Sequence, residues 1–265
     1  MNSDTYIKNT TDFCKNLNTD LVKKVFVFDQ ISSTNIKAKE FARKEEPEGT
    51  IVISRVQTEG RGRFDRKWES PDGGLYFSTI LRPKAKPNKT TLLTLVGALS
   101  VCKTINLLHN LSSTIKWPND VMINGKKVAG ILLEAELDDN KVDFVVLGIG
   151  INLNTDLNSL SSELRHNSTS IFNELNQTVD YCVFLKHLFL ALDEDYSKFI
   201  NQDINSILSE WKKHSDTIGK NVRISTPSEE IIGKASDIDE SGFLIITTDS
   251  GEQKKVNSGD CFYIK

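Results

Sequence analysis

The sequence of 265 residues has few of the features that mark secreted, membrane-spanning or metal-binding proteins. Its four cysteines are scattered, with no CxxC pair and no histidine at the spacing of a zinc ligand. The first residues contain no apolar stretch that could act as a signal peptide, and no apolar run of about 18 residues follows them. We therefore expect free thiols in a cytoplasmic protein without a membrane span.

Signatures of several enzyme classes are also absent. The sequence has no GxxxxGK[ST] phosphate loop and no GxSxG nucleophile motif, and its histidines have no partners at catalytic spacing. The formal net charge is -3, so a polyanion would have to bind a local basic cluster rather than the whole surface. The hydrophobic fraction of 38% and the charged fraction of 26% are typical of a globular chain that builds its own core.

Strands and helices alternate from residue 25 onward. The apolar patterns predict strands at 25–28, 50–56, 75–81, 113–116, 120–123, 127–136 and 142–149. They predict helices at 34–45, 92–109, 180–200 and 203–213. The dipeptide Asn124-Gly125 predicts a tight hairpin between two of these strands.

Three regions are expected along the chain. Residues 1–22 are polar and predict a tail or a short irregular helix, too short for a helix-turn-helix DNA-binding module. Residues 23–215 form the large domain. In residues 216–265, β-rich stretches recur about every ten residues between turn residues and predict a small all-β barrel.

The most unusual stretch is QTEGRGRFDRKW (residues 57–68), hereafter the basic loop. Gly60 and Gly62 let its backbone approach a ligand closely. Three arginines can surround an anion with forked donors: Arg61, Arg63 and Arg66. Taken alone, the stretch is also compatible with a solvated basic loop or a nucleic-acid patch.

Four further stretches carry candidate residues. They are SSTN (32–35), KWPND (116–120), KVAGILLE (127–134) and GIGIN (148–152). Lys127 opens an apolar strand, where a partly desolvated lysine can serve as a fixed positive charge. The alternatives stay open: a helix cap at 32–35, a turn at Asp120, a solvent-facing Lys127, and close packing at the glycines.

Together these stretches, in this order and spacing, resemble the catalytic domain of biotin protein ligases, and the resemblance covers residues 25–265. It implies an α/β (α+β) fold. A mixed β-sheet would carry helices mainly on one face, as in class II aminoacyl-tRNA synthetases and biotin ligases, followed by an SH3-like β-barrel.

The resemblance also implies a two-step reaction. Biotin and ATP give biotinyl-AMP and diphosphate, and a lysine of a biotin carboxyl carrier domain then takes the biotin.

The resemblance implies roles for individual residues. Catalysis would rest on Arg63, Lys127 and Asp120. Biotin would be bound by Ser33, Thr34, Asn35, Gln57, Gly60, Arg61, Gly62, Arg63, Lys127 and Gly130. ATP would be bound by Arg63, Arg66, Trp68, Lys116, Asn119, Lys127 and Asn152. Mg²⁺ would accompany ATP near Asp120, and related enzymes occur as monomers or homodimers.

One position departs from the family pattern. The family has glycine where this chain has Asp65, in a loop of the form GRGRxGRxW. Aspartate tolerates a left-handed backbone better than most residues, so the turn can be kept. Its charge would lie among arginines that bind phosphate, which puts in doubt the affinity for ATP or the rate of loop closure more than the reaction.

Three other functions remain as alternatives. A lipoate-type ligase shares the chemistry, but the basic loop, KWPND and the C-terminal barrel argue against it. A nucleic-acid-binding protein is disfavoured by the acidic balance and by the lack of interleaved aromatic residues. A sensor of biotin or nucleotide without turnover is left open by Asp65. The expected N-terminal tail argues against a role in DNA binding.

Overall fold

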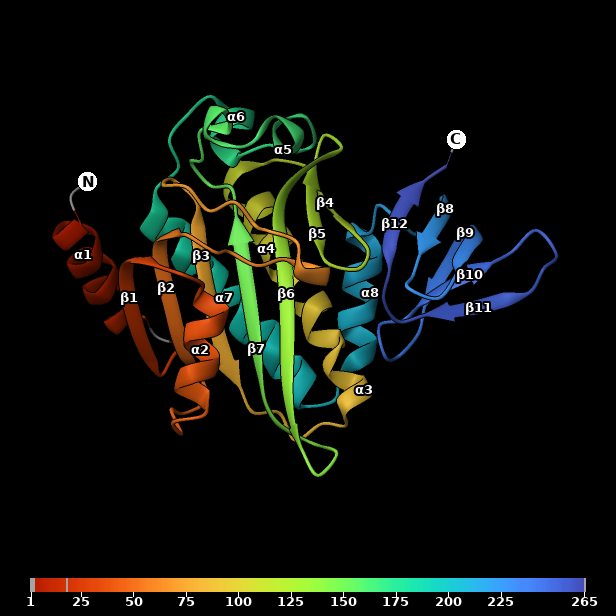
Figure 1. The fold of residues 1–265 in the computed structure, drawn as a ribbon, viewed down its shortest axis with the longest axis horizontal. Helices are drawn as coiled ribbons and strands as arrows, with labels where there is room; N and C mark the ends of the chain where they lie inside the picture. The colour runs from red at the N-terminus through yellow and green to blue at the C-terminus, as the bar shows by residue number, and fades with distance from the viewer. Residues whose placement is uncertain (1–2, 18, 265) are drawn as a thin grey trace.

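The computed structural model describes residues 3–17 and 19–264 and is built around a mixed sheet of seven strands (Figure 1). In spatial order the strands are β1 (Lys24–Ile31), β2 (Thr50–Gln57), β3 (Leu75–Leu81), β7 (Lys141–Ile151), β6 (Lys126–Asp138), β5 (Asp120–Ile123) and β4 (Ser113–Lys116). β1 and β2 run parallel, and every other neighbouring pair is antiparallel. The predicted mixed sheet is confirmed.

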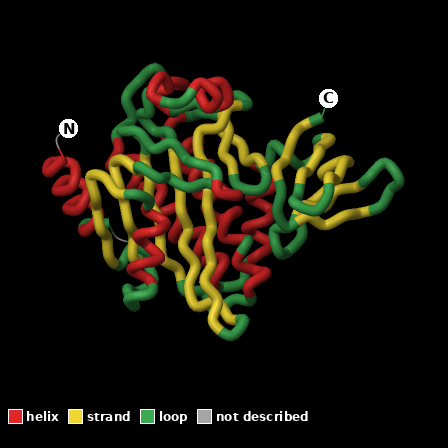
Figure 2. Tube along the Cα trace, viewed as in Figure 1, coloured by secondary structure: helices red, strands yellow, loops and turns green. Residues whose placement is uncertain are grey.

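Helices cover the two faces of this sheet unequally (Figures 1 and 2). The long helices α4 (Leu92–His109), α7 (Tyr181–Ile200) and α8 (Ile204–His214) pack on one face over the main core. The single helix α2 (Thr34–Ala42) packs on the other face, over a small cluster that includes Val52, Ile80 and Phe144. This arrangement agrees with the expected fold, and α2 is the one long helix on the second face within the described residues.

Helix α4 is apolar on nearly all sides because it is enclosed between the sheet and the other long helices. The stretch Pro87–His109 is long and apolar enough to span a membrane by length and composition, which the sequence reading did not anticipate. In the fold, 67% of its most apolar window is buried, as in the core helix of a globular domain.

The segment expected as a polar tail contains a regular helix, α1 (Ser3–Lys15), which lies beside β1 (Figure 1). Three of its side chains are buried at four-residue intervals: Tyr6, Thr10 and Cys14. The Tyr6 hydroxyl lies 3.0 Å from that of Tyr181 on α7. The first helix is therefore part of the packed structure.

The C-terminal residues form a second, antiparallel sheet. Its order is β11 (Gln253–Val256), β10 (Leu244–Thr247), β9 (Glu230–Ile238), β8 (Asn221–Ser225) and β12 (Asp260–Tyr263). This agrees with the small barrel-like domain expected from the sequence. The indole of Trp117 donates to the Gly242 carbonyl at 3.3 Å, and Lys89 pairs with Glu240, so the two domains are in contact.

Several short elements were not predicted. They are α3 (Pro87–Thr90), α5 (Ser162–Asn167), α6 (Ile171–Leu175) and two 3-10 turns, Arg63–Asp65 and Leu157–Ser159. The predicted hairpin between β5 and β6 is confirmed, since Asn124 and Gly125 both have positive φ, at 50° and 75°. All four cysteines are free thiols, as expected.

Candidate active site

A cavity of about 330 Å³ lies on the α2 side of the sheet, between the basic loop and the C-terminal domain. Figure 1 shows the basic loop, in orange, crossing the sheet over β7 and β6. The structure brings together Ser33, Thr34, Asn35, Gln57, Arg61, Gly62, Arg63, Arg66, Trp68, Lys116, Asn119, Asp120, Lys127, Gly130 and Asn152. Among the candidate residues, Gly60 does not line the cavity. A Cβ there would lie 2.3 Å from the Trp68 carbonyl oxygen, so this glycine supports the turn of the basic loop.

Glycines form the floor of the cavity. Gly130 on β6 and Gly150 on β7 are direct partners in the sheet. A Cβ on Gly150 would lie 2.6 Å from the Trp68 indole nitrogen, and one on Gly130 would lie 2.9 Å from the Trp68 ring. The indole of Trp68 can rest on the sheet only because both positions lack side chains.

A polar cluster closes the end of the cavity next to α2. The Gln57 side-chain oxygen accepts from the backbone N–H of Thr34 at 2.7 Å and from its hydroxyl at 3.0 Å. The Ser78 hydroxyl lies 2.8 Å from the Thr34 Oγ1 and 2.6 Å from the Asn35 Oδ1. These side chains hold one another in fixed orientations, which suits a small ligand with several polar atoms.

Gly148 makes room for this cluster, because a Cβ there would lie 2.0 Å from the Asn35 Oδ1. For biotin, the substrate that the sequence resemblance implies, we expect Gly148→Ala to displace Asn35 and to raise the KM about tenfold, through the loss of the Asn35 hydrogen bonds. Steady-state kinetics with that substrate varied measures this. Asn35→Ala is the matched control, and the double variant should be no worse than Asn35→Ala alone. An unchanged KM in folded Gly148→Ala would contradict this role of Asn35.

Arg63 is a partly buried cation whose hydrogen-bond acceptors are neutral. Its guanidinium donates to the Asn119 Oδ1 at 3.2 Å, to the Gly259 carbonyl at 3.2 Å and to the Ser258 hydroxyl at 2.9 Å. Burial lowers the pKa of Arg63, although the nearby charges of Asp260 and Asp120 oppose the shift. A partly desolvated cation whose hydrogen-bond acceptors are neutral can bind an anion that enters the cavity.

Lys127 and Asp120 form an ion pair at the start of β6 and β5. The Lys127 ammonium lies 2.6 Å from the Asp120 carboxylate and 5.2 Å from the centre of the Trp68 ring. The two side chains are 30% and 25% exposed, so the pair is partly screened from water. Lys127, Asp120 and Trp68, which the sequence suggested from separate motifs, therefore lie together in the structure, with Lys127 between the other two.

Asp260 connects the basic loop to the C-terminal domain. Its carboxylate accepts two hydrogen bonds from the Arg66 guanidinium. The hydrogen bond from Arg66 lowers the pKa of Asp260, and the same bond raises the pKa of Arg66. The C-terminal residues Gly259, Asp260, Cys261 and Phe262 line the cavity, which the sequence alone did not indicate.

Arg61, in the same loop, lies between two carboxylates. Its guanidinium lies 3.6 Å from Glu134 on β6 and 3.3 Å from Asp65. Burial acts to raise the pKa of Glu134, but hydrogen bonds from Lys39 and Asn35 and the charge of Arg61 outweigh it, and the net shift is downward. Glu134, which had no predicted role, thus links the basic loop to the polar cluster.

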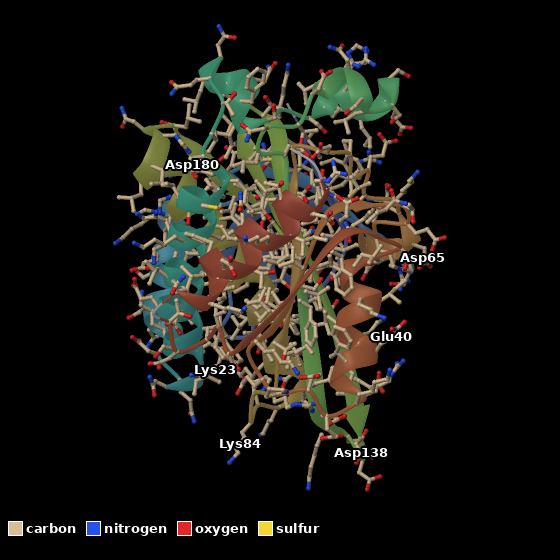
Figure 3. All side chains as sticks on the ribbon, turned by 90° about the vertical axis from the view of Figure 1, so that its left-hand side faces the viewer. Lys23, Glu40, Asp65, Lys84, Asp138 and Asp180 are labelled. Carbon is tan, nitrogen blue, oxygen red and sulfur yellow. The ribbon has the colours of Figure 1, made fainter. Side chains whose placement is uncertain are left out.

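Asp65 adopts the left-handed backbone expected for it, with φ of 57°, and Phe64 before it has φ of 54°. Its side chain is 93% exposed and lies at the outer edge of the molecule (Figure 3). The aspartate thus preserves the turn, and its carboxylate contacts Arg61 rather than the cavity.

The three remaining candidate residues, Asn119, Asn152 and Lys116, each contact a different part of the fold. The Asn119 amide donates to the Ile131 carbonyl at 2.9 Å, which fixes Asn119 beneath Arg63. The Asn152 amide donates to the Thr169 carbonyl at 3.0 Å. Lys116 lies 5.0 Å above the Tyr263 ring of the C-terminal domain. Across residues 3–17 and 19–264, no three His, Cys, Asp or Glu side chains cluster as a metal site would require.

Comparison with known proteins identifies the family of this site. Residues 27–152 match the Biotin/lipoate A/B protein ligase family, and residues 217–263 match the Biotin protein ligase C terminal domain. The chain is 37% identical over 246 residues to the bifunctional ligase/repressor BirA of Bacillus subtilis, covering 92% of this chain and 75% of that protein. It is 32% identical over 205 residues to the biotin–[acetyl-CoA-carboxylase] ligase of Paracoccus denitrificans, covering 76% and 85%.

A solved structure agrees with these relatives. The biotin protein ligase of Aquifex aeolicus in complex with biotin and ATP superposes with a TM-score of 0.79 at 30% identity, covering 92% of this chain and 99% of that one. The resemblance that the motifs indicated is confirmed, as is the two-part fold. The chain therefore belongs to the biotin protein ligase family of enzymes.

Proposed function

We propose that this enzyme joins biotin to the α-phosphate of ATP in the cavity and releases diphosphate. It then transfers biotin to a lysine of a biotin carboxyl carrier domain. The observation that carries the proposal is that one cavity holds three features: the partly buried Arg63 with its neutral acceptors, the Lys127 ammonium, and the polar cluster. Two anions must meet in the first step, and these fixed cations lower the cost of bringing them together.

In the first step, a carboxylate oxygen of biotin attacks the α-phosphorus, and the bond to the bridging oxygen of the diphosphate breaks. The polar cluster of Thr34, Asn35 and Gln57 would hold the uncharged end of biotin, so that its carboxylate extends toward Lys127. Arg63 and Lys127 would stabilise the negative charge that grows on the phosphate oxygens. Trp68, resting on Gly130 and Gly150, would contact the nucleotide.

A magnesium ion bound to the phosphates would supply further positive charge. When ATP provides most of the ligands, Mg²⁺ needs only one or two protein carboxylates. The cavity offers Asp120 and Asp260, each already beside a cation. These residues fit a metal that enters with the nucleotide, and Asp120 is the proposed contact.

In the second step, the amine of the acceptor lysine attacks the carbonyl carbon of the mixed anhydride, and AMP leaves. The amine must be neutral to attack, and the Asp120 carboxylate would orient it and accept its proton. The basic loop would keep water away from the anhydride between the two steps.

Four free thiols support a reducing compartment such as the cytoplasm as the site of this reaction.

The experiment is to incubate the protein with ATP, Mg²⁺ and a purified carrier domain, with either biotin or lipoate. We expect mass spectrometry to find one biotin on a single lysine of the carrier, and no lipoylated product. Attachment of lipoate in preference to biotin would contradict the proposal and would make the enzyme a lipoate ligase.

A further inference from the structure

Glu134 on β6 accepts hydrogen bonds from two residues of helix α2 that lie one helical turn apart. The Lys39 ammonium donates to its Oε1 at 2.7 Å, and the Asn35 amide nitrogen donates to its Oε2 at 2.9 Å. Arg61 of the basic loop lies 3.6 Å from the same Oε1 atom. Burial acts to raise the pKa of Glu134, but the hydrogen bonds from Lys39 and Asn35 outweigh it, so the carboxylate carries its charge at neutral pH.

An ionised carboxylate can only accept hydrogen bonds, and this decides which way the Asn35 amide points. If the amide were turned over, its oxygen would lie against a carboxylate oxygen of Glu134, where its nitrogen now donates. The Ser78 hydroxyl, 2.6 Å from the Asn35 Oδ1, can donate or accept, so it would follow either orientation. Of these two partners of the Asn35 side chain, Glu134 is therefore the one that fixes the amide.

The other amide of the polar cluster, Gln57, is fixed in an equivalent way by a partner that can only donate. Its oxygen accepts from the Thr34 backbone N–H at 2.7 Å, so its nitrogen points the other way and donates to the Ser70 hydroxyl at 2.9 Å. Asn35 and Gln57 both line the cavity, and each uses one N–H of its amide nitrogen in these bonds. The second N–H of each nitrogen can pair with a carbonyl oxygen of a ligand.

We propose that Glu134 is a positioning residue for biotin, which holds the Asn35 amide with its nitrogen available to the ureido oxygen of the substrate. The inference rests on the proposed function, in which the uncharged ring of biotin enters the polar cluster. The ureido oxygen is an acceptor, so it matches two amides that both present N–H groups. A reversed Asn35 would set oxygen against oxygen and leave polar atoms unpaired in the closed cavity.

The first test is Glu134→Gln, which keeps the shape of the side chain, removes its charge and lets it donate as well as accept. Asn35 can then turn over. By isothermal titration calorimetry we expect the Kd for biotin to rise about tenfold, the effect of one misdirected hydrogen bond. The Kd for biotin amide, which keeps the ureido ring and lacks the carboxylate, should rise by the same factor.

These two ligands separate orientation from charge. If Glu134 acted through its charge on an anionic substrate, its removal would tighten the binding of biotin and leave that of biotin amide unchanged, which would overturn the proposal. In steady-state kinetics, kcat and the KM for ATP should stay within about threefold of wild type. A fall in kcat with an unchanged KM for biotin would equally contradict a role in positioning biotin.

A double-mutant cycle shows whether Glu134 acts through Asn35. Glu134→Gln should add nothing to the loss of biotin affinity that Asn35→Ala causes alone. Additive losses would show that Glu134 acts through Lys39 or Arg61 instead, and would overturn the proposal.

Glu136→Gln is the matched control. Glu136 lies two residues further along β6 and pairs with Arg43, at the end of α2, at 2.6 Å. Both variants therefore remove an ion pair between β6 and α2, but only Glu134 contacts the polar cluster. We expect Glu136→Gln to leave the Kd for biotin within about twofold of wild type. An equal rise in both variants would show that the two carboxylates only fasten α2 to the sheet, whereas wild-type protein that does not bind biotin would overturn the proposed function itself.

Discussion

Replacing Lys127 with alanine is expected to slow biotin-dependent formation of the adenylate about 10²–10³-fold, the effect of removing one fixed group that stabilises transition-state charge. Lys127 is the cation closest to both Trp68 and Asp120, and it lies over the glycine floor, where a substrate can approach it. Rapid-quench measurement of the first turnover separates this step from transfer. A rate within about threefold of wild type would show that Lys127 does not contact the reacting phosphate.

Two further variants distinguish the loss of the Lys127 charge from the structural effects of removing its side chain. Lys127→Ala leaves Asp120 without its partner, so Lys127→Ala combined with Asp120→Asn tests whether an unpaired carboxylate causes the loss. We expect the double variant to remain as slow as Lys127→Ala. Lys127→Arg keeps the charge but is a poor substitute, because a planar guanidinium cannot reproduce the compact point charge of the lysine ammonium. Thermal unfolding of each variant checks that the fold is intact.

Replacing Arg63 with alanine is expected to raise the KM for ATP and to lower kcat, with a combined loss of about 10²-fold in kcat/KM for ATP. The change removes a cation from the cavity and also releases the basic loop from Ser258 and Gly259. The adenylate should then escape, so we expect free biotinyl-AMP in the medium when no carrier is present. Chromatography of the released nucleotides measures that leak.

Arg66→Ala is the matched control for Arg63→Ala. The Arg66 side chain is 60% exposed and its charge is already paired with Asp260, whereas Arg63 is partly buried and has neutral acceptors. An exposed ion pair contributes up to about 1 kcal/mol, so Arg66→Ala should reduce kcat/KM by less than about tenfold. Equal losses in the two variants would contradict the distinct role given to Arg63.

The sequence alone predicted the structure correctly at positions where the local residue pattern determines the backbone conformation. Helix α4 has the predicted bounds, because its run of apolar residues has the length of a helix and its ends are marked by polar residues. The hairpin at Asn124-Gly125 followed from turn chemistry, and the left-handed Asp65 from the tolerance of aspartate for that conformation. The motifs also indicated which candidate residues should meet, and fifteen of them line one cavity.

Long-range packing accounts for what the sequence did not reveal. Asp260 lies 194 positions from Arg66, and no local pattern marks it as a partner of the basic loop. The glycine floor depends on the pairing of Gly130 with Gly150, which only the strand register shows. The polar composition of the first residues predicted a tail or a short irregular helix, although the four-residue spacing of Tyr6, Thr10 and Cys14 in the regular helix α1 was visible in the sequence.

The most direct test of the central proposal is exchange of labelled diphosphate into ATP, measured with and without biotin in the presence of Mg²⁺. The cavity is proposed to bring the biotin carboxylate to the α-phosphate between Arg63 and Lys127, so exchange should require biotin and should be lost in Lys127→Ala. Exchange that proceeds equally without biotin, or none in folded wild-type protein, would contradict adenylation of biotin at this site.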